Sequence, residues 1–193
     1  MAGHARFTVV LDACVLFPIA TADALVSLAV AGLFSAKWTV AIEDEWVAVA
    51  DRCHPGLSGR FTNRRDAMRD AVLDWEVKAE GWQALAPSLT LPDPKDVHVL
   101  AAAIAGHADC IVTTNLKDFP ASILDVYGLV ALHPDDFIVA QLDLDLYSAL
   151  GAFKAMRARK RNPTYGAEEF AAAMERNGLV ASAERLRRAV DLI

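Results

Sequence analysis

The stretch Val9-Val10-Leu11-Asp12-Ala13-Cys14-Val15-Leu16 places an acidic residue at the end of a short apolar run. The run from Phe7 to Leu11 predicts a buried strand, and the pattern after Pro18 predicts a helix over residues 21–31 with Thr21 as its N-cap. A carboxylate at the end of a strand can reach a cleft without burying an unpaired charge. The opening of the chain therefore predicts a strand followed by a helix, with Asp12 at their junction as a functional acid or as a simple turn or cap residue.

Strand and helix patterns alternate along the rest of the first 142 residues. The predicted elements are an extended segment at 36–38, a helix from Thr39, a helix over 62–78 and a strand with a loop over 82–91. They continue with a helix that residues 93–96 open and that runs to about residue 106, strands over 110–114 and 129–132, and a helix over 137–142. This alternation is typical of a parallel sheet with right-handed crossovers. We therefore expect an α/β fold.

The segment from residue 143 to residue 193 has a different character. Its pattern predicts three helices, over 146–158, 167–176 and 180–189, and no strand. Residues 1–150 hold 10 Lys and Arg against 20 Asp and Glu, whereas residues 151–193 hold 9 against 5, so net charges of −10 and +4 make up the total of −6. We expect two domains, residues 1–142 and a helical extension over 143–193.

Composition indicates a soluble cytoplasmic protein. The hydrophobic content of 54% is ample for a core. The first residues contain only a short apolar run that leads into Asp12, so we expect no signal peptide. The most apolar helical stretch, residues 25–34, is about half of the roughly 20 residues that a membrane span needs, so we expect no membrane association. The three cysteines form no CxxC pair, as is typical of free thiols in a reducing compartment.

Four acidic residues far apart in the chain each stand where a predicted strand ends or a predicted helix begins. They are Asp12, Glu45, Asp96 and Asp118. Acids at the carboxyl ends of parallel strands and at adjoining helix starts converge on the crevice where open α/β sheets bind ligands. Carboxylates held together repel one another unless a cation compensates, and Mg²⁺ or Mn²⁺ prefers such oxygen ligands. The pattern therefore predicts a divalent metal site suited to phosphodiester chemistry.

Four segments carry a resemblance to a known family. They are Leu11 to Pro18, Glu43-Asp44-Glu45-Trp46, the segment that begins Asp93-Pro94-Lys95-Asp96, and Thr113-Thr114-Asn115-Leu116-Lys117-Asp118-Phe119-Pro120. In order and spacing they resemble the motifs of PIN-domain nucleases, particularly the VapC-like ribonuclease toxins of bacterial toxin-antitoxin systems. The tail, with Asn162-Pro163 and Gly178-Leu179, is similar to the helical extension of one branch. The resemblance implies a PIN-like three-layer α/β/α fold with a central parallel sheet and a C-terminal helical extension.

The resemblance also assigns roles to the acids. Asp12, Glu45, Asp96 and Asp118 would be the catalytic metal ligands. Glu43 competes with Glu45, but residues two apart on a helix do not point to one place, and Glu45 fits the motif better because it precedes Trp46.

Two motif positions leave the local roles open. Asp93 suits an N-cap, whereas Asp96 suits either a first-turn acid or a ligand. Asn115 stands where many relatives have an acid, and Cys14 stands where relatives commonly have a hydroxyl or amide residue, for which a thiol is a weak replacement.

Function follows from this resemblance as an expectation. The chain would be a Mg²⁺- or Mn²⁺-dependent endoribonuclease that acts on tRNA, rRNA or mRNA, the toxin of a pair with a cognate antitoxin, and a homodimer. Thr113 and Asn115 would orient water or phosphate. Because an acidic site repels RNA, basic residues must guide the substrate, or they form a solvated face or a surface for an acidic partner; the candidates are Arg64, Arg65, Arg157, Arg159, Lys160 and Arg161. The alternative is a degenerate PIN domain that binds RNA or an antitoxin without cleavage.

Overall fold

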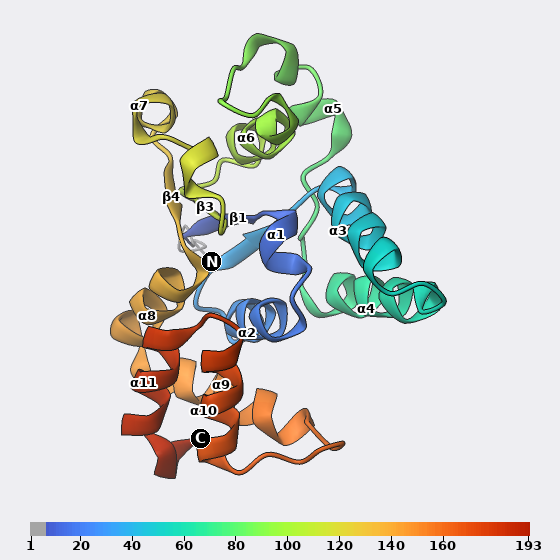
Figure 1. Ribbon diagram of the computed structural model, residues 1–193. Helices are drawn as coiled ribbons and strands as arrows, with labels where there is room; N and C mark the ends of the chain where they lie inside the picture. Colours follow the sequence, from blue (N-terminus) through green and yellow to red (C-terminus); the bar gives the residue numbers. More distant parts are fainter. Residues whose placement is uncertain (1–6) are drawn as a thin grey trace. The chain divides into compact units, whose positions relative to one another are not determined.

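The computed structural model describes residues 7–193, which contain a four-stranded parallel sheet (Figure 1). The strands are β1 (Thr8–Leu11), β2 (Ser35–Lys37), β3 (Cys110–Val112) and β4 (Val130–Leu132). Their order across the sheet is β2-β1-β3-β4, and every pair is parallel. The expectation of no signal peptide concerns in part residues 1–6, which lie outside the described residues.

The register of the two central strands brings their carboxyl ends to the same edge of the sheet. Leu11 pairs with Val112, so the next residues, Asp12 and Thr113, leave the sheet side by side. The Asp12 amide still donates to the Val112 carbonyl at 3.1 Å, and the Thr113 amide donates to the Leu132 carbonyl at 3.0 Å. Parallel pairing thus aligns polar residues that are separated by a hundred positions in the sequence.

Two compact units make up the described chain. The first contains the sheet and spans the described residues up to Phe17 together with Phe34–His133, and the second spans Pro18–Leu33 and Pro134–Ile193. The helices of the first unit are α1 (Ala13–Leu16), α3 (Val40–Cys53), α4 (Ser58–Ala71), α5 (Ala79–Trp82), α6 (Val97–Ala105) and α7 (Ala121–Leu124). Those of the second unit are α2 (Ile19–Val30), α8 (Pro134–Leu144), α9 (Leu146–Arg159), α10 (Ala167–Arg176) and α11 (Val180–Arg188).

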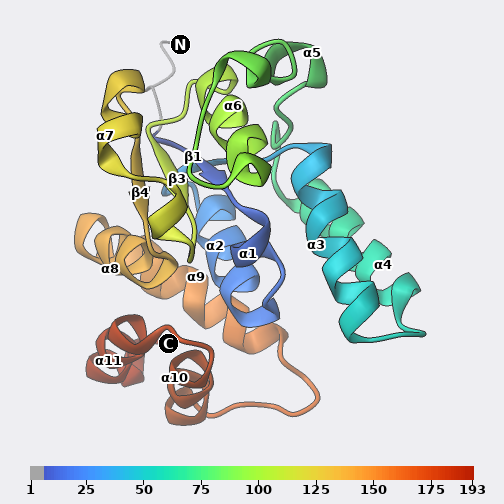
Figure 2. The same ribbon diagram turned by 45° about the horizontal axis from the view of Figure 1, so that its top comes forward.

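Capping residues determine where the helices that carry the acids begin. Thr39 is the N-cap of α3, and its hydroxyl accepts from the Ile42 amide at 3.1 Å. Asp93 caps the 3-10 turn η2 (Pro94–Asp96), which leads directly into α6. Helix α6 packs against β1 and β3, while α3 and α4 lie side by side (Figure 2). The starting points of α3 and of η2 therefore determine where Glu45 and Asp96 lie relative to the sheet of the first unit.

The second unit is a group of helices around its own apolar core. Helix α2 contacts α8, α9 and α10, and Leu28, Phe137, Phe153 and Phe170 are almost fully buried. The carboxylate of Asp135 on α8 accepts from the Ser182 amide and hydroxyl at 2.8 and 2.5 Å, which satisfies free donors at the start of α11. The helices are therefore joined by apolar packing and by one buried cap.

Three local predictions were wrong. Residues 82–91 contain the end of α5 and the 3-10 turn η1 (Ala86–Ser88) rather than a strand, because Pro87 has no amide to donate to a sheet. Helix α4 ends at Ala71, not at residue 78, and Glu76 instead bridges to Trp38. Thr21 is buried inside α2, whose N-cap is Pro18.

The expected fold class is confirmed: a parallel sheet is flanked by helices, and the C-terminal part is helical. The three predicted tail helices begin at the expected residues. The boundary between residues 142 and 143 stays a prediction. Among residues 7–193, no helix has the length and the apolar character to cross a membrane.

Candidate metal centre

Asp12 lies at the end of β1 and is the N-cap residue of α1. Its side chain is buried, and Oδ2 accepts from the Thr113 hydroxyl at 2.7 Å and from the Cys14 thiol at 3.0 Å. The Thr113 hydroxyl in turn accepts from the Asn115 amide at 3.0 Å. Both contacts to Asp12 are made to one oxygen, so Oδ1 is the oxygen that can face a cation.

Cys14 fills a polar position in this arrangement. Its sulfur accepts from the Thr114 amide at 3.2 Å while the thiol donates to Asp12. Burial, followed by the charge of Asp12, raises the pKa of the thiol to about 11, so the thiol keeps its proton near neutral pH. The thiol therefore makes, more weakly, the kind of contact that a hydroxyl or amide would make at this position.

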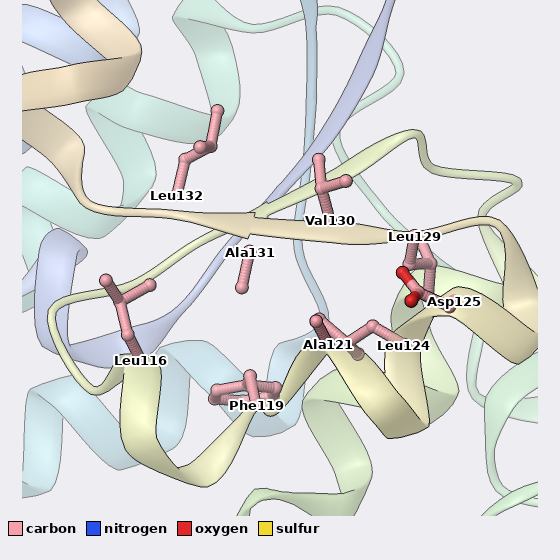
Figure 3. A pocket seen from close by; sticks show the side chains of 9 residues that line it. All are labelled: Leu116, Phe119, Ala121, Leu124, Asp125, Leu129, Val130, Ala131 and Leu132. Atoms are coloured by element: carbon pink, nitrogen blue, oxygen red, sulfur yellow. The ribbon is translucent and has the colours of Figure 1, made fainter.

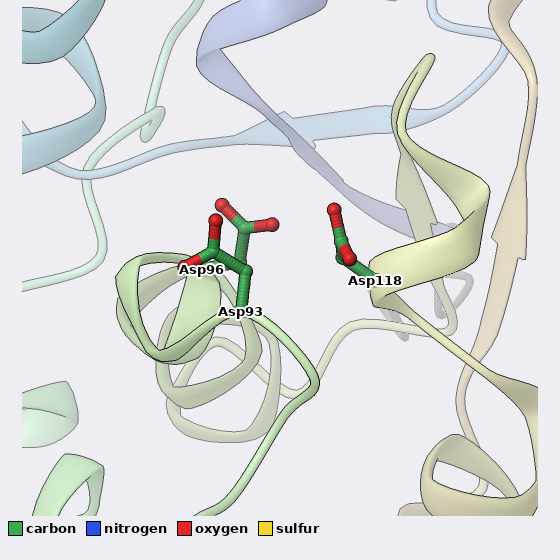
Figure 4. A group of neighbouring side chains, drawn as sticks. All are labelled: Asp93, Asp96 and Asp118. Carbon is green, nitrogen blue, oxygen red and sulfur yellow. The ribbon is translucent and has the colours of Figure 1, made fainter.

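Three further carboxylates face one another across the same edge of the sheet (Figure 4). Asp93 and Asp96 come from the turn before α6, and Asp118 comes from the 3-10 turn η3 (Leu116–Asp118) after β3. One oxygen from each lies within 4.8 Å of the others. The side-chain amide of Asn115 donates to Asp96 at 3.3 Å and also to Asp118, so Asn115 holds two of these acids in place.

The pKa of Asp96 is shifted by burial and by the negative charges around it. Burial raises it to about 6, with further increases from Asp12, Asp93, Asp118 and Glu45 in that order. Asp96 is thus an acid on which the charges of four other carboxylates act. The structure therefore brings together Asp93, Asp96 and Asp118, and Asp12 acts electrostatically on Asp96. The sequence had indicated mainly a capping role for Asp93.

Glu45 and Glu43 have different surroundings. Glu43 is almost fully buried and accepts from Trp38 Nε1 at 2.8 Å and from Arg69 Nε at 3.0 Å, so it connects helices and a strand end inside the unit. Glu45 is half exposed and interacts with the acidic cluster: burial raises its pKa, His98 lowers it, and Asp12 and Asp93 raise it. Of these two acids, Glu45 is the one that faces the cluster.

His98 is a neighbour of the cluster that the sequence did not indicate. Its Nδ1 lies 2.7 Å from the Lys95 carbonyl, and its Nε2 lies 3.5 Å from Glu45 Oε2. A carbonyl only accepts, so Nδ1 carries a proton in this geometry. In the sequence, the only sign that His98 lies near the site is its position two residues after Asp96.

The basic residues named from the sequence mostly have partners of their own. Arg64 donates to the Phe17 carbonyl at 2.9 Å and to the Leu16 carbonyl, and Arg65 pairs with Asp66 at 2.9 Å. The others belong to the second unit, where Arg157 binds backbone carbonyls and Arg159 and Lys160 pair with Asp23. Arg161 is exposed. The contacts of Arg64 with the Phe17 and Leu16 carbonyls do not join it to a carboxylate of the acidic cluster.

A hollow of about 340 Å³ lies between β4 and the segment from η3 to α7 (Figure 3). Its lining is apolar apart from Asp125, and it includes Leu116, Phe119 and Leu132. Such a surface has no cation for a phosphate and no second acid for a metal. Within the first unit, the acidic cluster is thus the candidate for phosphodiester chemistry.

The donor set fits a hard divalent cation. Carboxylate oxygens within 4.8 Å of one another can approach a common ion with small rotamer changes, and Mg²⁺ and Mn²⁺ take oxygen ligands at about 2.0–2.2 Å. Burial and then the neighbouring acids raise the pKa of Asp96, and a cation there would offset both effects. Asp93, Asp96 and Asp118 are the residues whose oxygens lie this close together, and Asp12 and Glu45 act electrostatically on Asp96.

The fold and the acidic site define a class of protein. A PIN-domain model matches residues 8–117, more than half of the chain, and this chain therefore belongs to the PIN-domain family. A model of the VapC50 C-terminal domain matches residues 134–188. The expected resemblance to VapC-like proteins is thereby confirmed.

One relative adds detail to this assignment. The Mycobacterium tuberculosis (strain ATCC 25618 / H37Rv) protein named "Putative ribonuclease VapC50" is 62% identical to this chain over 50 residues. That match spans 26% of this chain and 30% of the relative. No solved structure matches the chain.

Proposed function

We propose that this protein is a Mg²⁺- or Mn²⁺-dependent endoribonuclease and the toxin of a toxin-antitoxin system. The observation that carries the proposal is the convergence of Asp96, Asp118 and Asp93, with Asp12 and Glu45 electrostatically coupled to them. The similarity to a protein named as a ribonuclease supports RNA as the substrate. The proposed site residues are Asp12, Glu45, Asp96 and Asp118, with Thr113 and Asn115 as orienting groups.

Each proposed site residue has its own role. Asp12, Glu45, Asp96 and Asp118 would hold the cation, which when bound supplies charge stabilisation and lowers the pKa of water. Thr113 donates to Asp12 and so fixes the rotamer of that carboxylate. Asn115 keeps Asp96 and Asp118 close to each other, and the neutral Cys14 thiol adds no further negative charge beside Asp12.

Hydrolysis of RNA also needs an oriented phosphate. In Figure 4 the side chains of Asp93 and Asp96 lie opposite that of Asp118, and a phosphate would have to reach the space that these acids share. Family resemblance supports products with 5′-phosphate and 3′-hydroxyl ends. It also supports a cognate antitoxin and a homodimer as partners, and a cytoplasmic location in which the target RNA is accessible.

The first test is cleavage of purified RNA with Mg²⁺ or Mn²⁺, with EDTA as the metal-free arm. Asp12→Asn should lower the cleavage rate by at least about 100-fold, because even residues that only support a metal ligand contribute about 10–100-fold. Asp44→Asn is the matched control, since Asp44 is an exposed acid beside Glu45 on the same helix. It should cleave like the unchanged chain.

The alternative outcome would identify a binding-only PIN domain. The observation that favours this second function is that Asn115, an amide, occupies a motif position where many relatives have an acid. Its side chain bridges Asp96 and Asp118. Folded protein free of antitoxin that binds RNA but leaves it intact with either metal would replace the nuclease by that function. Equal cleavage by the unchanged chain and Asp12→Asn would show that Asp12 is not in the active site.

A further inference from the structure

A hollow of about 550 Å³ lies entirely within the second unit. The start of α2, the end of α9, the segment over residues 160–166 and α10 surround it. Met156, Phe170 and Met174 line it and are almost fully buried, so the side chains that they present are firmly packed. A hollow of this size is in the range of about 300–1,000 Å³ that small organic groups occupy.

Positive charge gathers at the rim of this hollow. Arg159 lies 2.9 Å from Asp23 Oδ1 and 2.7 Å from the Ser27 hydroxyl, and Lys160 lies 2.5 Å from Asp23 Oδ2. Arg161 adds an exposed guanidinium. Three cations and one carboxylate leave a net charge of +2, and Asp23 holds two of the cations in position before any ligand arrives. A preorganised cationic rim is suited to a phosphate.

Aromatic and amide groups complete the lining. Tyr165 lines the hollow, and its carbonyl accepts from Arg157 at 2.8 Å, which ties the segment over 160–166 to α9. The Asn177 side-chain amide donates to the Ala173 carbonyl at 2.8 Å, which leaves its oxygen as an acceptor. Asn162 contributes a second amide. Amides of this type hydrogen-bond to the edges of nucleobases, and a tyrosine ring stacks on their faces.

We propose that this hollow binds one unpaired nucleotide of an RNA strand, an inference that rests on the proposed function. The base lies against Tyr165 and the apolar side chains, and its phosphate lies at Arg161 and the Asp23-held cations. RNA is favoured over an acidic protein segment because carboxylates would satisfy the cations but would leave the two asparagine amides without base edges to read. Of the basic residues that the sequence indicated in this unit, Arg157 therefore has a structural role, whereas Arg159, Lys160 and Arg161 line the proposed nucleotide site.

The test measures binding of a short, unstructured, fluorescein-labelled oligoribonucleotide by anisotropy. The Asp12→Asn chain in EDTA is used, so that cleavage does not enter the result. In this background Arg161→Ala and Tyr165→Ala should each weaken binding roughly tenfold, because an aromatic stack is worth about 5- to 150-fold per base. Lys154→Ala is the matched control: it removes one exposed cation from α9 outside the lining, and it should change binding less than about twofold.

A second measurement locates the nucleotide. Photo-cross-linking of the same oligonucleotide carrying 4-thiouridine should label a peptide that contains Tyr165 or Met174, and circular dichroism should show that each variant is folded. Unchanged affinity in both folded variants would overturn the proposal. The proposal would also be overturned if the protein bound a glutamate-rich peptide but not RNA, and if these substitutions weakened the binding of the peptide. Because binding is measured without metal, a failure of the nuclease assay with normal RNA binding would count against the proposed function alone.

Discussion

Asp96 shows how a single residue responds to the charges around it. Its pKa is raised to about 6, above the usual value of about 3.9, first by burial and then by neighbouring acids. The folded protein therefore binds a proton at Asp96 more tightly than the unfolded chain does. Without metal, ionised Asp96 therefore destabilises the fold above about pH 6, and this destabilisation is relieved as the pH falls through 6 toward the unfolded pKa of about 3.9.

Asp96→Asn should consequently stabilise the metal-free protein while removing its response to metal. At pH 7.5 in EDTA we expect Tm to rise by roughly 2–4 °C, which corresponds to about 1 kcal/mol after allowance for solvent screening. Millimolar Mn²⁺ should raise the Tm of the unchanged chain but not that of Asp96→Asn. Thermal unfolding with and without Mn²⁺ makes the comparison, with Asp44→Asn as the control. A destabilised Asp96→Asn chain with an intact Mn²⁺ response would contradict the assignment.

Among the site residues, some could be assigned from the sequence and others only from the structure. Asp12 could be placed because a short apolar strand precedes it in the sequence. The motif favoured Glu45 over Glu43, but the partners that bind Glu43, Trp38 and Arg69, come from elsewhere in the unit and could not be read from the sequence. The contribution of His98 could not be read from the sequence, because a single histidine without metal-ligand spacing has many roles.

Helices α3 and α4 are joined by a polar contact as well as by apolar packing. Glu43 on α3 is almost fully buried, and Arg69 on α4 binds it with two nitrogens while its guanidinium lies 4.9 Å from the centre of the Trp75 ring. Removal of one partner would leave a buried charge without full compensation. This contact therefore determines how firmly α4 is held.

Arg69→Met should lower the free energy of unfolding by about 2–3 kcal/mol, less than for a wholly buried pair because the Arg69 side chain is 31% exposed. Urea unfolding followed by circular dichroism measures this change. Arg65→Met is the control, since Arg65 pairs with its exposed neighbour Asp66, and such pairs are worth about 0–1 kcal/mol. Equal effects of the two substitutions would show that Glu43 does not depend on Arg69.

Element boundaries were predictable where caps and periodicity agreed. Thr39 predicted the start of α3, and the tail helices followed their apolar spacing. The strand expected over residues 82–91 failed because apolar composition alone does not distinguish a strand from short helical turns. The early end of α4 depends on the bridge between Trp38 and Glu76, a contact between distant segments.

At the scale of the whole molecule, the second helix belongs with the C-terminal helices. Leu25 and Leu28 on α2 are fully buried, and α2 contacts α8, α9 and α10. A chain that ends at residue 133 would keep α2 but lose these partners. The exposed apolar face would then favour aggregation.

We expect the chain of residues 1–133 to be insoluble or to bind the dye 8-anilinonaphthalene-1-sulfonate strongly, unlike the full chain. Expression yield, dye fluorescence and light scattering check this. Leu25→Gln with Leu28→Gln should reduce dye binding by the shortened chain, and the same pair should lower the Tm of the full chain because both positions are at 0% exposure. A soluble, cooperatively unfolding 1–133 chain without dye binding would show that α2 does not need the C-terminal helices.

The sequence by itself determined the α/β class, the helical tail and the strand-end position of Asp12, because hydrophobic periodicity and capping are local properties of the chain. Only the tertiary structure decided which acids share one site, since the register of β1 and β3 and the start of α6 set the distances between side chains. It also decided that α2 packs with the tail, and that Arg157 binds carbonyls whereas Arg159 and Lys160 bind Asp23. Those outcomes depend on contacts between residues far apart in the sequence, which composition and spacing do not encode.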